Sequence, residues 1–125
     1  MKVLLIDDSM LSRTILKRSL GLEHQYIEAE NGMRGLEIFF IERPQLVILD
    51  LTMPGMNGLE ILEKLHEIDP NAKIIIGSAD IQEFTRKRAE ELGASAYLTK
   101  PFTPESVQEA VRRVMGESAG DGDTL

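Results

Sequence analysis

The chain of 125 residues contains no cysteine and no tryptophan, and only 5% of its residues are aromatic. Without cysteine it can form neither a disulfide framework nor a zinc site with thiolate ligands. No apolar run approaches the roughly 20 residues of a membrane-spanning helix, and Met1-Lys2-Val3 lacks the layout of a secretory signal. We therefore expect a cytoplasmic protein that needs no cross-link for stability.

Basic residues are also scarce relative to acidic ones. Lys and Arg number 14 against 21 Asp and Glu, which gives a formal net charge of −7. Affinity for nucleic acid comes mainly from cationic contacts with phosphate, and anionic membrane surfaces attract basic segments. We therefore expect neither nucleic acid nor a membrane as a direct partner.

Short apolar runs alternate with longer stretches of helical period. Strands are predicted near 2–7, 25–29, 46–50, 73–77 and 95–99, and helices near 9–20, 32–43, 58–68, 81–92 and 104–115. Five consecutive strand–helix units predict an α/β fold with a parallel sheet covered on both faces. Residues 117–125 are small and polar, so we expect one domain over 1–116 followed by a disordered tail.

The predicted strands differ in how apolar they are. Those at 2–7, 46–50 and 73–77 are nearly continuous Val, Ile and Leu, as expected for strands buried on both faces. Residues 25–29 alternate and 95–99 are mixed, which predicts edge strands. With right-handed crossovers, the order 2-1-3-4-5 of the flavodoxin-like, doubly wound fold follows. Its switch point lies between the first and third strands.

Residues suited to one ligand follow four of these strands. Asp7 and Asp8 follow the first strand, Asp50 the third, Ser78 the fourth and Lys100 the fifth. The carboxyl ends of parallel strands open on one edge of a sheet, so these side chains should converge. Three carboxylates and one ammonium group suit a divalent cation such as Mg²⁺ beside a phosphoryl group.

Each of these residues also has an ordinary structural interpretation. An aspartate after a strand can simply cap the next helix, a lysine at a sheet edge is usually solvated, and Ser78 can be a loop serine. In the functional interpretation, Asp50 attacks phosphorus and forms an acyl phosphate. The Ser78 hydroxyl then bonds a phosphoryl oxygen. The coincidence of four strand ends favours the functional interpretation.

The chain resembles the receiver domains of two-component signalling over about residues 2–115, and in size it is nearest to the single-domain receivers of chemotaxis. Those receivers are themselves a standard example of the strand order 2-1-3-4-5. The matching residues are Asp7-Asp8-Ser9 with Arg13 and Leu16, Asp50 with Met53-Pro54 and Asn57-Gly58, Ser78-Ala79, and Lys100-Pro101-Phe102.

The resemblance implies a role for each residue of the acidic site. Asp50 resembles the phosphoacceptor. Asp8 resembles a direct ligand of Mg²⁺ and Asp7 a ligand through water, with the acceptor and the backbone carbonyl of Thr52 completing the protein ligands. Lys100 is similar to the lysine that pairs first with the acceptor and then with the phosphoryl group.

The resemblance also implies a switch. Ser78 resembles the hydroxyl that moves toward the phosphoryl group, and Tyr97 resembles the aromatic residue that is exposed in one state and buried in the other. Tyr97 can equally be an edge-strand aromatic packed on the last helix. The surface that changes would span helix 81–92, strand 95–99 and helix 104–115.

A sensor histidine kinase or a phosphotransfer protein is the phosphodonor that the resemblance implies, and a downstream protein is the target. Such a chain assists its own phosphorylation and dephosphorylation but is not a turnover enzyme. We expect a monomer or a phosphorylation-linked dimer.

Three alternatives make different demands on the sequence. A phosphatase of the haloacid dehalogenase type needs its nucleophile on the first strand and a second Asp two residues later, where this chain has Ser9. A flavin- or nucleotide-binding module needs a Gly- or Ser/Thr-rich phosphate loop after that strand. A receiver-like scaffold that is never phosphorylated predicts a broken acidic set, whereas this set is intact.

Overall fold

The computed structural model describes residues 1–55, 57–80 and 82–116, in which strands and helices alternate along the chain. The strands are β1 (Lys2–Ile6), β2 (Gln25–Ala29), β3 (Leu46–Leu49), β4 (Ile74–Ser78) and β5 (Ala96–Thr99). The helices are α1 (Met10–Leu20), α2 (Gly32–Glu42), α3 (Gly58–Ile68), α4 (Glu83–Glu91) and α5 (Pro104–Met115). The predicted helix start at residue 81 and the predicted tail 117–125 lie outside the described residues.

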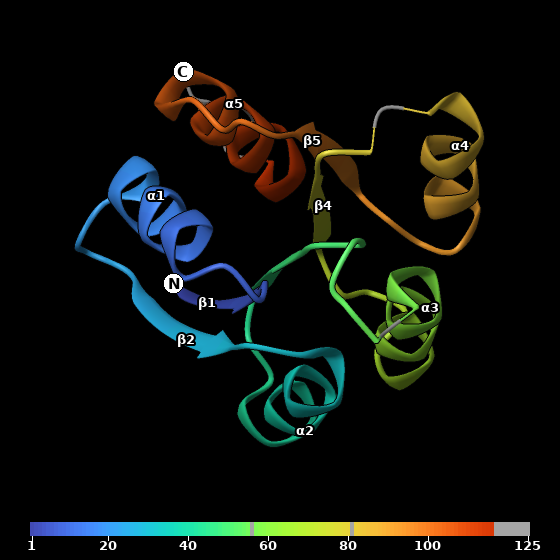
Figure 1. The fold of residues 1–125 in the computed structure, drawn as a ribbon. Coiled ribbons are helices and arrows are strands. Elements are labelled where there is room, and N and C mark those ends of the chain that lie inside the picture. The colour runs from blue at the N-terminus through green and yellow to red at the C-terminus, as the bar shows by residue number, and fades with distance from the viewer. Residues whose placement is uncertain (56, 81, 117–125) are drawn as a thin grey trace.

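The strands form one parallel sheet in the order β2-β1-β3-β4-β5 (Figure 1). The predicted doubly wound, flavodoxin-like α/β fold is therefore confirmed. β1 pairs with β2 on one side and with β3 on the other, so that Val3 lies between Tyr26 and Leu46. The two strands with the least continuous apolar sequence, β2 and β5, occupy the edges as predicted.

Alternate side chains of each central strand enter two separate cores. On β1, Leu4 and Ile6 pack in the core beneath α2, α3 and α4, while Val3 and Leu5 pack in the core beneath α1 and α5. Figure 1 shows the two groups of helices on opposite faces of the sheet. Burial on both faces explains why the central strands are apolar at nearly every position.

Helix α4 is the least anchored of the five helices. Ala89 is the one buried residue within Glu83–Glu91, and Gln82 at the N-cap makes no side-chain capping bond. By contrast, α5 begins with a reciprocal capping box between Thr103 and Ser106 and buries an apolar stripe. Few buried contacts give a segment a low free energy of local opening.

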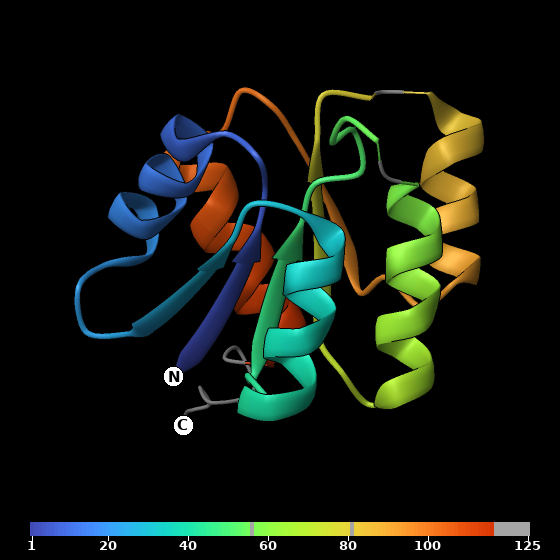
Figure 2. The same cartoon turned by 60° about the horizontal axis from the view of Figure 1, so that its bottom comes forward.

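Backbone hydrogen bonds continue beyond the strands at the carboxyl edge of the sheet, which is uppermost in Figure 2. The N–H of Asp7 donates to the Ala29 carbonyl at 3.0 Å, and the N–H of Asp50 donates to the Ile6 carbonyl at 2.9 Å. The N–H of Lys100 likewise donates to the Ser78 backbone carbonyl at 2.9 Å. Each of these residues is thus held by its neighbouring strand before its side chain makes any contact.

Candidate functional site

Three carboxylates meet where β1 and β3 end, as the strand order predicted. One oxygen from each of Asp7, Asp8 and Asp50 lies within 4.8 Å of the others. Asp7 and Asp50 are only 2% and 3% exposed, while Asp8 is exposed at the mouth of the cleft. The cluster therefore has buried charge at its base and an opening to solvent at Asp8.

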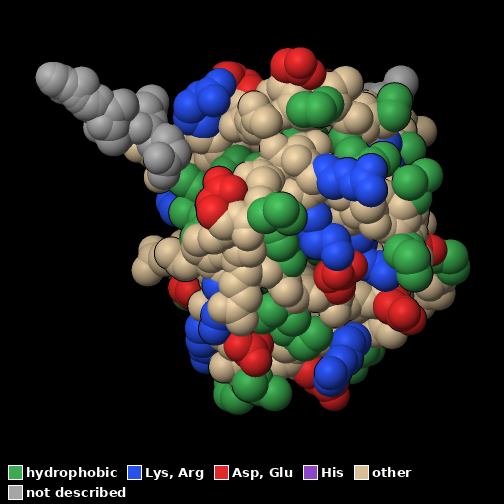
Figure 3. Space-filling model, turned by 90° about the vertical axis from the view of Figure 1, so that its left-hand side faces the viewer, with side chains coloured by type: hydrophobic (Ala, Val, Ile, Leu, Met, Phe, Trp, Pro, Cys, Tyr) green, Lys and Arg blue, Asp and Glu red, His purple; other side chains and the backbone are tan. Residues whose placement is uncertain are grey.

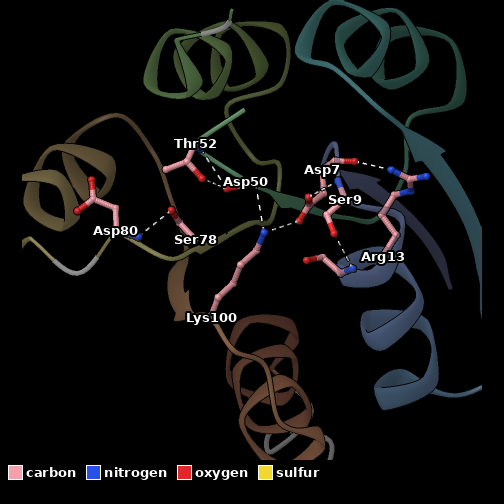
Figure 4. Close-up of polar contacts among 9 residues, drawn as sticks. Asp7, Ser9, Arg13, Asp50, Thr52, Ser78, Asp80 and Lys100 are labelled. Carbon is pink, nitrogen blue, oxygen red and sulfur yellow. Dashed lines mark hydrogen bonds and ion pairs between the residues drawn. The ribbon is translucent and has the colours of Figure 1, made fainter. Parts of the chain in front are cut away.

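Lys100 reaches this cluster from the end of β5. Its Nζ lies 3.1 Å from Oδ2 of Asp7 and 3.3 Å from Oδ2 of Asp50 (Figure 4). Burial lowers the pKa of Lys100, but the charges of Asp7 and Asp50 and the hydrogen bonds to them outweigh it, so the pKa lies above its usual range. Lys100 therefore stays charged at neutral pH.

The surroundings of Asp7 destabilise the ionised form of its carboxyl group. Burial raises its pKa, the hydrogen bond from the Ser9 N–H lowers it, Asp50 raises it and Lys100 lowers it, with a net rise. A single ammonium group does not balance three neighbouring carboxylates. The site therefore favours an additional positive charge.

Asp50 is held by the loop that follows it. Its Oδ1 accepts hydrogen bonds from the Thr52 backbone N–H at 3.0 Å and from the Thr52 hydroxyl at 2.9 Å, while Oδ2 faces Lys100. The hydroxyl contact was not anticipated from the sequence, although an Asp two residues before a Thr is a common local pairing. The predicted ligand role of the Thr52 carbonyl stays a prediction.

Ser78 and Tyr97 are both linked to Asp80. Ser78 is fully buried and its Oγ accepts from the Asp80 N–H at 3.1 Å. The Tyr97 hydroxyl donates to the Asp80 carbonyl at 2.7 Å, and burial raises the pKa of this phenol. The Tyr97 ring packs with the core beneath α2, α3 and α4, with the Arg86 guanidinium 5.0 Å from its centroid. The alternative that placed Tyr97 on the last helix is therefore wrong.

Arg13 contributes to the site in a way the sequence did not predict. It is 7% exposed, and its Nη1 donates to the backbone carbonyl of Asp7 at 2.6 Å. Its Nε donates to Glu28 on β2 at 2.7 Å. A lone arginine on the inner side of a helix was the available signal, because a buried guanidinium requires acceptors.

The donor set fits Mg²⁺. Mg²⁺ prefers hard oxygen ligands and is commonly held by one or two carboxylates together with water and phosphate oxygens. Asp7, Asp8 and Asp50 provide such oxygens in one place, with negative charge in excess of the Lys100 ammonium. The cleft thus has the composition for a divalent cation beside an anionic phosphoryl group.

A family model described as the response regulator receiver domain matches residues 3–112. The chain belongs to the response regulator receiver family. Sporulation initiation phosphotransferase F of Bacillus subtilis (strain 168) is 36% identical over 115 residues, which cover 91% of this chain and 93% of that protein. Chemotaxis protein CheY of Thermotoga maritima is 37% identical over 115 residues, which cover 90% and 96%.

Solved structures give the same family. A CheY-like receiver domain protein from Methanospirillum hungatei JF-1 superposes with a TM-score of 0.86 at 26% identity, covering 97% of this chain and 98% of that one. Receiver domains work in two-component and phosphorelay systems and bind Mg²⁺ at an acidic pocket, and the cluster of Asp7, Asp8 and Asp50 forms such a pocket here. None of the helices in the described ranges has the length and apolar character to span a bilayer.

Proposed function

We propose that the chain is a phosphoacceptor switch in which Asp50 receives a phosphoryl group from a phosphohistidine. One observation carries the proposal: a 3%-exposed carboxylate sits 3.3 Å from the Lys100 ammonium, beside two further carboxylates. The chain belongs to the response regulator receiver family, which does not support the alternative of a phosphatase of the haloacid dehalogenase type. The intact acidic set also argues against a scaffold that is never phosphorylated.

In the chemical step, an oxygen of Asp50 attacks phosphorus in line with the phosphorus–nitrogen bond of the donor. That bond breaks, its electron pair goes to the imidazole nitrogen, and the imidazole takes up a proton. The Lys100 ammonium lies close enough to pair first with the Asp50 carboxylate and then with the oxygens of the transferred phosphoryl group. Asp50 then holds the phosphoryl group as an acyl phosphate until water attacks phosphorus and the Asp50 carboxylate leaves. We propose that the chain acts as a covalent acceptor and not as a turnover enzyme.

Mg²⁺ would be held by Asp7, Asp8, Asp50 and the backbone carbonyl of Thr52. When bound, it supplies positive charge that offsets the developing negative charge on the phosphoryl oxygens. The residues of the chain orient the acceptor: the two Thr52 donors on Oδ1 fix the plane of the Asp50 carboxylate.

The response to phosphorylation starts at Ser78. Its Oγ accepts from the Asp80 N–H, which leaves the hydroxyl proton free to bond a phosphoryl oxygen. Movement of Ser78 would disturb the loop whose Asp80 carbonyl holds Tyr97. Phosphorylation would then act as a local electrostatic event on a two-state element formed by α4, β5 and α5. Moving such an element from mostly off to mostly on requires about 5 kcal/mol.

The donor protein must cover the rim of the cleft to bring its phosphohistidine to Asp50. Met10 and Leu11, at the start of α1, are 71% and 69% exposed beside this rim. A shallow cavity of 340 Å³ next to them is lined by Leu11, Ile15, Lys100 and Pro101 among others. We infer that a histidine kinase or phosphotransfer protein docks here, which implies a cytoplasmic location.

The downstream target would bind the surface formed by α4, β5 and α5. Phe84 on α4 is 75% exposed on that surface and offers an apolar anchor for a protein partner. A phosphorylation-linked dimer would form through the same surface.

Incubation with acetyl phosphate and Mg²⁺, followed by intact mass measurement, tests the proposal. We expect an adduct of one phosphoryl group that is lost in Asp50→Asn. Asp69→Asn, which removes a carboxylate at the far end of α3, should keep the adduct. Steady release of phosphate without an adduct would favour a phosphatase, and an inert chain that still binds Mg²⁺ would favour a scaffold.

A further inference from the structure

Arg13 is a buried cation with one partner on β2 and another directly after the end of β1. A guanidinium removed from water is stable only where its N–H groups find acceptors. Nε of Arg13 donates to Oε1 of Glu28 at 2.7 Å, and Nη1 donates to the backbone carbonyl of Asp7 at 2.6 Å. The ion pair with Glu28 alone would fasten α1 to β2. The bond to the Asp7 carbonyl links this pair to the acidic cluster as well.

The edge strand β2 restrains both backbone polar groups of Asp7, the N–H directly and the carbonyl through Arg13. The Asp7 N–H donates to the Ala29 carbonyl at 3.0 Å, one step beyond the last paired residues of β1 and β2. The Asp7 carbonyl is held through Arg13 by Glu28, the residue before Ala29 (Figure 4 shows Arg13 against Asp7). Two adjacent residues of β2 thus fix the end of β1.

The Asp7 carbonyl belongs to the planar peptide that joins Asp7 to Asp8. Fixing this plane limits the directions in which the Asp8 side chain can leave the backbone. Asp7 has other restraints on its side chain, from the Ser9 N–H at 2.9 Å and from Lys100 at 3.1 Å. Asp8 is exposed, so packing does not orient it, and its place in the cluster depends on this peptide.

We propose that Arg13, held by Glu28, is a positioning residue for the divalent cation site: it fixes the Asp7–Asp8 peptide so that both carboxylates enter one pocket. The inference rests on the proposed function, which supplies the cation. Groups that orient metal ligands through hydrogen bonds typically contribute ten- to hundredfold to metal affinity.

Arg13→Met separates positioning from electrostatics, because the two predict opposite signs. Removing a positive charge beside three carboxylates should by itself strengthen the binding of a cation. Losing the bond to the Asp7 carbonyl should weaken it. We expect the dissociation constant for Mg²⁺ to rise about tenfold.

Lys17 offers a matched control within the same network. Its Nζ pairs with Oε2 of Glu28 at 2.7 Å. Figure 3 shows basic and acidic side chains interspersed on the side of the molecule that carries α1 and β2. Lys17→Met removes one positive charge and one ion pair to Glu28 but leaves Arg13 on the Asp7 carbonyl. We expect its dissociation constant for Mg²⁺ to stay within about twofold of the unmodified chain.

The measurement is calorimetric titration of the full, unphosphorylated chain with MgCl₂, with the amide resonances of Asp7 and Asp8 followed by NMR as a second readout. In Arg13→Met these two resonances should shift before Mg²⁺ is added, and in Lys17→Met they should not. Arg13→Lys keeps the charge but not the planar fork of donors, so we expect an affinity between those of the unmodified chain and Arg13→Met.

Two results would overturn the inference alone: equal or tighter Mg²⁺ binding by folded Arg13→Met, or an equal loss in Lys17→Met. Should Arg13→Met not fold, Arg13→Lys carries the test, because it keeps the positive charge, with circular dichroism as the check on folding. A dissociation constant for Mg²⁺ above that of the unmodified chain supports the inference, and an unchanged or lower value refutes it. An unmodified chain that binds no Mg²⁺ refutes the proposed function as well, which separates the two failures.

Discussion

At the scale of single residues, the cleft has more negative charge than its surroundings can stabilise. Asp7 and Asp50 are almost fully buried and share the Lys100 ammonium at 3.1 and 3.3 Å. Burial and the charge of Asp50 both raise the pKa of Asp7, and the Ser9 N–H and Lys100 compensate only in part. A site prepared for a cation and a phosphoryl group is therefore destabilising while both are absent.

Asp7→Asn should make the chain more stable in the absence of divalent cations. An Asp whose pKa is raised on folding costs stability while it is ionised, and this cost disappears as the pH falls through the folded pKa toward the unfolded value near 3.8. Near pH 7 we expect a higher free energy of unfolding than in the unmodified chain, with a smaller difference near pH 4. Urea denaturation at the two pH values measures it.

Asp8→Asn is the matched control for this substitution, because Asp8 belongs to the same cluster but is exposed. Its effect on stability should be smaller, since solvent screens an exposed charge. A less stable Asp7→Asn near pH 7 would contradict the argument and would mean that the pairing with Lys100 outweighs burial.

At the scale of elements, the position of Lys100 depends on how the loop after β5 packs against β4. Phe102, two residues beyond Lys100, is 9% exposed and lies against Gly77 of β4. A Cβ built on Gly77 would stand 2.9 Å from the tip of the Phe102 ring. The absence of a side chain at Gly77 therefore lets this loop approach the sheet beside Ser78.

Gly77→Ala should displace Phe102 and, with it, Lys100. Overpacking of this kind costs about 1–3 kcal/mol, so we expect a lower free energy of unfolding together with slower phosphorylation by acetyl phosphate. Gly77→Ala combined with Phe102→Leu, which shortens the ring side chain, should recover part of the rate. Equal rates in the unmodified chain and Gly77→Ala would show that Lys100 is placed independently of this contact.

Helix α4 should open more readily than its neighbours. Ala89 is its one buried residue, whereas α3 buries Gly58, Ile61, Leu62 and Leu65. Native-state hydrogen exchange should show amides within 83–91 opening at a lower free energy than those within 58–68. Equal protection of the two helices would remove the physical basis for α4 as the moving element of the switch.

The sequence predicts most of this architecture because its signals are local. The continuous apolar runs of β1, β3 and β4 and the weaker patterns of β2 and β5 were sufficient for the strand order. The convergence of Asp7, Asp50 and Lys100 followed from that order. The contacts of Arg13 with Glu28, and of Phe102 with Gly77, were not predicted, because they join residues from separate elements whose spacing depends on tertiary packing.

At the scale of the whole molecule, the acidic cleft is the place where the two layers of helices are joined. Asp7 and Asp8 lead into α1 and Lys100 into α5 on one face of the sheet. Asp50 leads into α3 and Ser78 into α4 on the other face. A ligand that brings these strand ends together therefore restrains elements on both faces at once.

Mg²⁺ should accordingly stabilise the entire domain and not only its loops. A ligand that binds the folded state at ten times its dissociation constant adds about 1.4 kcal/mol to the free energy of unfolding. For a domain of this size that raises the melting temperature by about 5 °C. Because the chain carries a net charge of −7, salt alone also screens repulsion, so the comparison is with NaCl at equal ionic strength.

Asp50→Asn should have a higher melting temperature than the unmodified chain without Mg²⁺, and Mg²⁺ should raise its melting temperature by less. An equal rise in both chains would place the ion elsewhere.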